Sequence, residues 1–244
     1  MLDALEEEHA NSTEALLEAT VIQSFGRHYT VVLATGQQLQ AKPRGKRSDC
    51  AVGDQVQIRM TSKDEAVIEA IAPRRNLLMR AEEHRSKIFA ANVDVLAYVV
   101  APDPPVHDEL LVRACTAALA AGITPWLILN KSDLIESFNA LRQRMHKHAA
   151  AAPQQFELST RTGEGLDALK TALRGLRVVF AGQSGMGKST LLNALHPGAK
   201  QVIGELSIAL SAGKHTTTAT RMFQLNGQTE LIDSPGFQAF GVAH

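Results

Sequence analysis

Between Thr20 and Pro73 the chain alternates apolar and polar positions in short runs separated by Gly, Asp and Pro. This twofold repeat is typical of half-buried β-strands. The runs are TVIQSFG, HYTVVLATG, QLQAKP, DQVQIRM and EAVIEAIAP. Short strands in such close succession predict a small all-β barrel of the OB type.

From Val93 onward, apolar stretches alternate with segments of helical spacing. The expected strands are VDVLAYVVA, TPWLILN, QFELS and RVVFAG, and the expected helices are HDELLVRACTAALAAG, LIESFNALRQRMHKHAA, EGLDALKTALRG and KSTLLNALH. Strands that alternate with helices form a mostly parallel sheet covered on both faces. We therefore expect an acidic tail over residues 1–19, an OB-fold domain over residues 20–73, a polar linker over residues 74–92 and an α/β domain over residues 93–244.

Composition narrows the setting in which the protein acts. The 244 residues carry 25 basic and 25 acidic side chains, so any nucleic-acid surface must be local. The only two cysteines, Cys50 and Cys115, argue against a disulfide framework and favour a reducing compartment. Neither a membrane-length apolar run nor a signal pattern is visible. We expect a cytoplasmic monomer with no membrane partner.

The stretch GQSGMGKST fits the phosphate-loop pattern G-x-x-x-x-G-K-[ST] and lies between an expected strand and an expected helix. Its glycines allow backbone N–H groups to converge on phosphate oxygens. Lys188 is expected to reach the β- and γ-phosphates, and the Ser189 hydroxyl to bind Mg²⁺. The phosphate-binding candidates are Gly182, Gln183, Ser184, Gly185, Met186, Gly187, Lys188, Ser189 and Thr190.

The stretch NKSD closes an expected strand and is a candidate guanine site. The Asp133 carboxylate can accept hydrogen bonds from guanine N1–H and N2–H₂, a donor pair that adenine lacks. Asn130 can tie this loop to the phosphate loop, and the stem of Lys131 can cover the base. The next loop, LSTRTGEG, can add Ser159 and Thr160 to the guanine site, and it can at the same time serve as a helix-start turn.

A third set of candidates concerns the metal and the γ-phosphate. Asp233, in LIDSPG, is expected to hold Mg²⁺ through water, and the Gly236 N–H to contact the γ-phosphate. The preceding loop, SAGKHTTTAT, offers the Thr217 hydroxyl as a further ligand. The base motif here precedes the phosphate motif. Because a domain whose termini lie close together can be cut and rejoined without losing its site, this order predicts a circular permutation.

With a small barrel followed by NKSD, GQSGMGKST, GKHTTT and DSPGF, the chain resembles the RsgA (YjeQ) family of circularly permuted GTPases over roughly residues 20–244. The resemblance implies GTP as substrate, GDP as product, Mg²⁺, and ribosome-dependent hydrolysis in late maturation of the small ribosomal subunit. It also implies that the OB domain contacts rRNA.

The resemblance further implies that His215 orients the attacking water. Ras-type enzymes use a glutamine just after Asp-x-x-Gly, where this chain has Phe237. A solvent-facing loop histidine is the alternative. The family also implies a helical domain with a Cys/His zinc site, for which this sequence holds no ligand set. A shortened chain and a family member without that module both fit.

The basic loop KPRGKR offers four candidate RNA contacts, namely Lys42, Arg44, Lys46 and Arg47. Such side chains can neutralise backbone phosphates, although a solvated charged loop is the alternative. Two further functions stay open at this point. One is another P-loop enzyme, such as a kinase or an ATPase. The other is a nucleotide-regulated RNA-binding module with negligible turnover.

Overall fold

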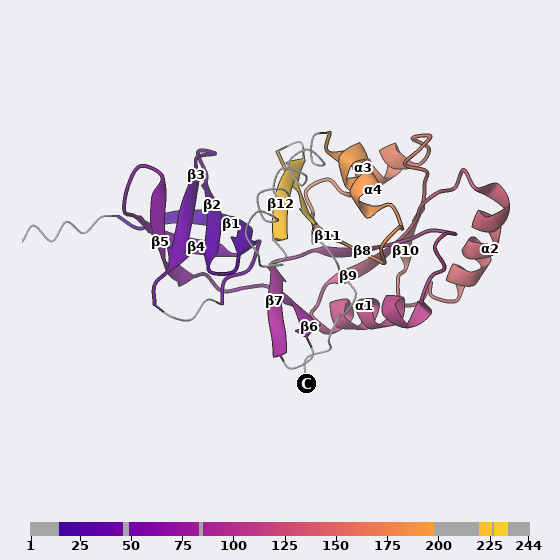
Figure 1. Cartoon of the computed structure of the whole chain (residues 1–244), viewed down its shortest axis with the longest axis horizontal. Coiled ribbons are helices and arrows are strands. Elements are labelled where there is room, and N and C mark those ends of the chain that lie inside the picture. The colour runs from indigo at the N-terminus through magenta and orange to yellow at the C-terminus, as the bar shows by residue number, and fades with distance from the viewer. Residues whose placement is uncertain (1–14, 46–48, 83–84, 198–219, 226, 234–244) are drawn as a thin grey trace, which may run out of the picture.

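A computed structural model of the chain describes residues 15–45, 49–82, 85–197, 220–225 and 227–233 (Figure 1). Its first part is a barrel, and its second part is a mixed sheet flanked by helices. The barrel strands are β1 (Leu17–Phe25), β2 (His28–Leu33), β3 (Gln38–Pro43), β4 (Gln55–Met60) and β5 (Glu65–Ile71). Each overlaps one of the alternating runs of the sequence.

The barrel closes on itself. Its strand order is β1-β2-β3-β5-β4, and β4 pairs back onto β1. The β3–β5 pair is parallel and the other pairs are antiparallel. Alternate residues such as Val21, Val31 and Ile58 fill the interior and are 0% exposed. The predicted OB-type barrel is thereby confirmed.

The stretch that we expected to be a polar linker contains a β-hairpin. Its strands β6 (Leu77–Glu82) and β7 (Arg85–Ala91) pair antiparallel and form a two-stranded sheet. Leu78 and Phe89 are buried in the hydrophobic core of the α/β part. The linker interpretation gave too much weight to the charged residues and too little to these apolar positions.

The α/β part is built on parallel strands in the order β10-β9-β8-β11-β13, followed by the antiparallel strand β12. The strands are β8 (Val95–Val100), β9 (Thr124–Leu129), β10 (Gln154–Glu157), β11 (Arg177–Ala181), β12 (Thr220–Leu225) and β13 (Thr229–Asp233). The helices are α1 (Asp108–Ala120), α2 (Ile135–His146), α3 (Leu166–Ala172) and α4 (Lys188–Leu195). Every residue of β8 and β11 is buried, as expected for central strands covered on both faces.

The strand order reverses between β8 and β11. From β8 the chain proceeds outward to β9 and β10, then returns to β11 beside β8 and continues in the other direction to β13. The loops after β8 and β11 therefore begin side by side, at the carboxyl ends of neighbouring parallel strands. In open α/β sheets, ligands bind at such a reversal of strand order. The phosphate-loop motif follows β11 at this point.

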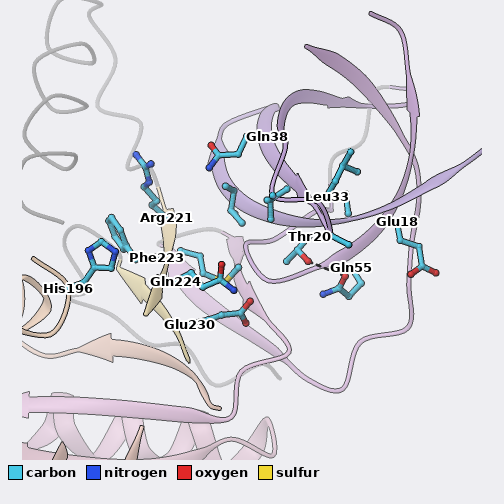
Figure 2. A pocket seen from close by; sticks show the side chains of 16 residues that line it. Glu18, Thr20, Leu33, Gln38, Gln55, His196, Arg221, Phe223, Gln224 and Glu230 are labelled. Atoms are coloured by element: carbon cyan, nitrogen blue, oxygen red, sulfur yellow. Dashed lines mark hydrogen bonds between the residues drawn. The ribbon is translucent and has the colours of Figure 1, made fainter. Parts of the chain in front are cut away.

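Strand β12, which the sequence did not predict, joins the two parts of the molecule. One edge pairs with β13 and the other with β1, through the residue pairs Gln23–Arg221 and Ser24–Thr220. Next to this short pairing lies a cleft of about 590 Å³. Figure 2 shows Thr20, Gln38 and Gln55 on its barrel side and His196, Arg221 and Phe223 on its α/β side.

Candidate nucleotide-binding site

Two glycines of the phosphate loop lie where a side chain would collide with the neighbouring loops. A Cβ atom on Gly182, whose φ is +133°, would lie 2.3 Å from the carbonyl oxygen of Val99. A Cβ atom on Gly187, whose φ is +90°, would lie 2.3 Å from Asn130 Nδ2. Both conformations are rare for residues other than glycine. The glycines thus allow the loop to pack directly against β8 and the NKSD segment.

Lys188, the first residue of α4, folds back over the phosphate loop. Its Nζ donates hydrogen bonds to the carbonyl oxygens of Gly182 and Gln183, each at 2.6 Å. Burial lowers the pKa of Lys188, and the nearby Asp233 carboxylate partly opposes this shift. The ammonium group therefore lies over the phosphate loop, where the charge of Asp233 also acts on it. Ser189 and Thr190 follow it in the first turn of α4 and are exposed.

Asn130, at the end of β9, connects three loops through one fully buried side chain. Its Nδ2 donates to the carbonyl oxygen of Met186 at 3.0 Å. Its Oδ1 accepts hydrogen bonds from the backbone N–H of Lys131 at 2.8 Å and from that of Thr160 at 3.2 Å. These contacts bring together the phosphate loop, the NKSD segment and the loop after β10.

The Asp133 carboxylate lies beside the loop that follows β10. Ser159 Oγ donates to Asp133 Oδ1 at 2.5 Å, and Arg161 Nε donates to Oδ2 at 2.8 Å. The hydrogen bond from Ser159 and the guanidinium of Arg161 lower the pKa of Asp133, so the group is ionised at neutral pH. Ser159 Oγ also accepts the backbone N–H groups of Arg161 and Thr162, each at 3.2 Å. The loop after β10 therefore contacts the Asp133 carboxylate, and the same Ser159 side chain also stabilises a turn in this loop.

A segment that the sequence analysis did not single out packs across the phosphate loop. Lys131 Nζ donates to the carbonyl oxygen of Asp103 at 2.5 Å. The side-chain oxygen of Gln183 accepts the backbone N–H of His107 at 2.8 Å. A Cβ atom on Gly185 would lie 2.8 Å from Pro104 Cδ. Residues 103–107 have no motif in the sequence. Arg161 lies in the LSTRTGEG loop but was not a candidate, because its contact arises only when this loop meets the NKSD segment.

Some of the remaining candidate residues lie outside the part of the chain that the structure describes. His215, Thr217, Gly236, Lys46 and Arg47 lie outside the described residues. Ser184 is exposed on the phosphate loop. Within the described ranges, no group of three or more His, Cys, Asp or Glu side chains could hold a metal ion.

Of the RNA-contact candidates, Lys42 and Arg44 are described. Lys42 is exposed at the end of β3. Arg44 Nη1 lies 2.7 Å from Glu69 Oε2, and Arg59 Nη2 lies 2.5 Å from the other oxygen of that carboxylate. The charge of Arg44 is thus partly balanced within the barrel.

The strand order, the phosphate loop after β11 and the reversed order of the motifs define a circularly permuted P-loop GTPase preceded by an OB-like barrel. A family model described as RsgA GTPase matches residues 71–243. The small ribosomal subunit biogenesis GTPase RsgA of Bordetella pertussis is 47% identical over 229 residues, which is 93% of this chain and 76% of the relative. The protein of the same name from Paraburkholderia xenovorans is 44% identical over 232 residues, or 92% of this chain and 73% of the relative. The chain belongs to the RsgA GTPase family.

Solved structures agree with the fold. The crystal structure of YjeQ from Thermotoga maritima aligns with a TM-score of 0.70 and 26% identity, covering 91% of this chain and 76% of the other. YloQ, described as a circularly permuted GTPase, aligns with a TM-score of 0.64 and 22% identity, covering 98% of this chain and 76% of the other. Both alignments extend over the barrel and the α/β part of this chain, so the two solved structures share its fold.

Proposed function

We propose that this protein hydrolyses GTP to GDP and phosphate in the late maturation of the small ribosomal subunit. The single observation that carries the proposal is the set of hydrogen bonds of Asn130. These bonds hold the guanine-type motif against the phosphate loop despite the reversed chain order. The names of the relatives supply the cellular role, since they are small ribosomal subunit biogenesis GTPases.

Guanine selection is assigned to Asp133, with Asn130 and Ser159 as the groups that position it. The Asp133 carboxylate is ionised, so it favours a base that offers hydrogen-bond donors. Guanine offers two donors on one edge, whereas adenine lacks this pair of donors and gains no such hydrogen bonds from the carboxylate. Lys131, held by Asp103, lies next to this group and is assigned to cover the base. Thr160 lines the same loop.

The phosphates are assigned to Gly182–Thr190 and to Gly236. Nucleotide binding would draw Lys188 from its two loop carbonyls to the phosphate oxygens, where its positive charge offsets the charge that develops in the transition state. The exposed Ser189 hydroxyl and the Asp233 carboxylate fit the oxygen ligands that Mg²⁺ prefers, with Thr217 as a further candidate. Mg²⁺ would supply charge neutralisation at the β- and γ-phosphates.

His215 is assigned to orient the attacking water, because Phe237 cannot form hydrogen bonds with it. We further assign the barrel, with Lys42, Arg44, Lys46 and Arg47, to contacts with rRNA phosphates of the small subunit. In this setting the protein acts as a monomer in the cytoplasm. None of the helices in the described part of the chain is long and apolar enough to cross a membrane.

Phosphate release from GTP and from ATP, each with and without purified small subunits, tests the proposal. We expect release from GTP that rises when subunits are added, and little release from ATP. Equal rates with both nucleotides would contradict guanine selection. No turnover under any condition would contradict the enzymatic assignment.

The Asp133→Asn variant tests the base assignment directly. An amide in place of the carboxylate loses an acceptor for guanine but can donate to the extra carbonyl of xanthine. We expect GTP affinity to fall by about tenfold or more, which corresponds to one lost charge-assisted hydrogen bond, and affinity for xanthosine triphosphate to rise. Competition against a fluorescent nucleotide measures both. Unchanged GTP preference would remove Asp133 from the site.

A further inference from the structure

Arg161 covers the part of the Asp133 carboxylate that a guanine base would use. Its Nε and Nη2 donate to Asp133 Oδ2 at 2.8 Å and 2.7 Å, while Ser159 Oγ donates to Oδ1 at 2.5 Å. The side chain of Asp133 is 9% exposed and that of Arg161 is 73% exposed. A nearly buried carboxylate is therefore closed toward the solvent by an arginine that itself lies mostly in water.

The donor group of Arg161 resembles the edge of the base. In guanine, N1–H and N2–H₂ are attached to the same carbon, C2, and with N3 they form a guanidine unit within the ring. In arginine, Nε–H and Nη–H₂ are attached to Cζ in the same planar arrangement. A carboxylate pairs with such a planar donor set in either molecule. Because both donor sets need Asp133 Oδ2, the arginine and the base exclude one another.

We propose that Arg161 is an internal substitute for guanine, which pairs with Asp133 in the empty site and must be displaced when a guanine nucleotide binds. This inference rests on the proposed role of Asp133 in base selection. It makes Arg161 an affinity-determining residue. Its pairing stabilises the empty form, because it supplies the donors to Asp133 Oδ2, and it makes no contribution to the bound form.

Removal of Arg161 should therefore tighten binding. In Arg161→Ala the nucleotide-free protein loses the stabilising ion pair with Asp133, whereas the free energy of the nucleotide-bound protein is unchanged. Since Arg161 is mostly exposed, its pair belongs to the weaker class of ion pairs, and we expect the Kd for GDP to fall by about two- to fivefold. The gain should appear in the association rate constant, because the site no longer has to release an arginine. The dissociation rate constant should stay unchanged.

Stopped-flow binding of a GDP analogue that carries its fluorophore on the ribose measures both rate constants. Arg142→Ala is the matched control. Arg142 pairs with Glu157 on β10, at the entry to the same loop, through Nε at 2.6 Å. The control removes an equal charge from the same neighbourhood and leaves Asp133 with its partners. Arg161→Lys keeps the charge but loses the planar donor pair, so it should lie between wild type and Arg161→Ala.

The outcomes separate this inference from the proposed function. Wild-type protein that binds ADP as tightly as GDP would overturn the role of Asp133, and the inference with it. If wild type prefers GDP but Arg161→Ala binds GDP equally or more weakly, only the inference on Arg161 fails. It also fails if Arg142→Ala tightens binding as much, since the effect would then come from net charge. Tighter and faster binding in Arg161→Ala alone would support it.

Discussion

Gly187 meets two requirements at once, a left-handed backbone and contact with a neighbouring side chain. Its φ is +90°, and an added Cβ atom would lie 2.3 Å from Asn130 Nδ2. Asn130 would have to move, and its hydrogen bonds to Met186 and Thr160 would be lost. The absence of a side chain at Gly187 thus allows the NKSD segment to stay hydrogen-bonded to the phosphate loop.

Gly187→Ala should consequently lose nucleotide affinity by about tenfold or more, since one disrupted buried hydrogen bond is worth roughly 1–3 kcal/mol. Gly175→Ala is the control, because Gly175 has a φ of +73° with nothing within 4 Å of an added Cβ. Both variants pay the cost of the left-handed conformation, about 1–2 kcal/mol of unfolding free energy. Only Gly187→Ala should change the Kd measured with fluorescent GDP. Equal affinity in the two variants would contradict the clash with Asn130.

Among single residues, sequence reasoning identified those whose chemistry is local. The phosphate-loop pattern places Lys188 and the glycines directly, because a loop between a strand and a helix fixes their geometry. Asn130 was also predicted to tie the two loops. Arg161 and Asp103 could not be found in this way, since an exposed arginine or a backbone carbonyl acquires its partner only when separate loops come together.

At the scale of elements, the β6–β7 hairpin is the main difference from expectation. Leu78 on β6 is 1% exposed and belongs to the core of the α/β part. A segment that had been taken for a polar linker therefore contributes to the packing of the catalytic domain. The alternating strands of the barrel and the apolar strands β8 and β11 were recognised because each carries its own burial pattern. The sequence of β12 has no such pattern. It is recognised as a strand only through its pairing with β13 and β1 in the structure.

Truncation of Leu78 distinguishes a packed hairpin from a linker. Leu78→Ala should lower the unfolding free energy by about 2–5 kcal/mol, as for other buried leucines. Leu119→Ala on α1 is the control, because Leu119 is 56% exposed and its loss should change stability by about 0.5 kcal/mol or less. Urea unfolding followed by circular dichroism measures both values. Similar stabilities for the two variants would mean that the hairpin does not belong to the core.

At the scale of the whole molecule, Arg177 holds the barrel, the hairpin and the α/β sheet together. It begins β11 and is 9% exposed. Its Nη1 donates to the carbonyl oxygens of Gly53 at 2.7 Å and of Ala91 at 3.3 Å, and its Nε donates to Glu230 Oε2 at 2.6 Å. One buried guanidinium thus bonds the barrel loop before β4, strand β7 and strand β13.

Arg177→Ala should weaken the attachment of the barrel. Arg177 is nearly buried but its ion-pair partner Glu230 is 24% exposed, so the loss of the pair and of the hydrogen bonds to backbone carbonyls should cost about 1–3 kcal/mol. We expect a lower melting temperature and faster protease cleavage between the barrel and the α/β domain. Arg75→Ala serves as control, because Arg75 is 62% exposed in its pair with Asp94 and should be worth about 1 kcal/mol or less. Identical digestion of the two variants would show that Arg177 does not hold the parts together.

Strand β12 has a consequence for how the protein senses its nucleotide. It is hydrogen-bonded on one side to β13, which ends at Asp233, and on the other side to β1 of the barrel. A shift of β13 on loss of the γ-phosphate would thus be transmitted through β12 to β1. The barrel would then rotate relative to the α/β domain. Since linkage is reciprocal, the rRNA contact that we propose for the barrel would in turn change the affinity for GTP relative to GDP.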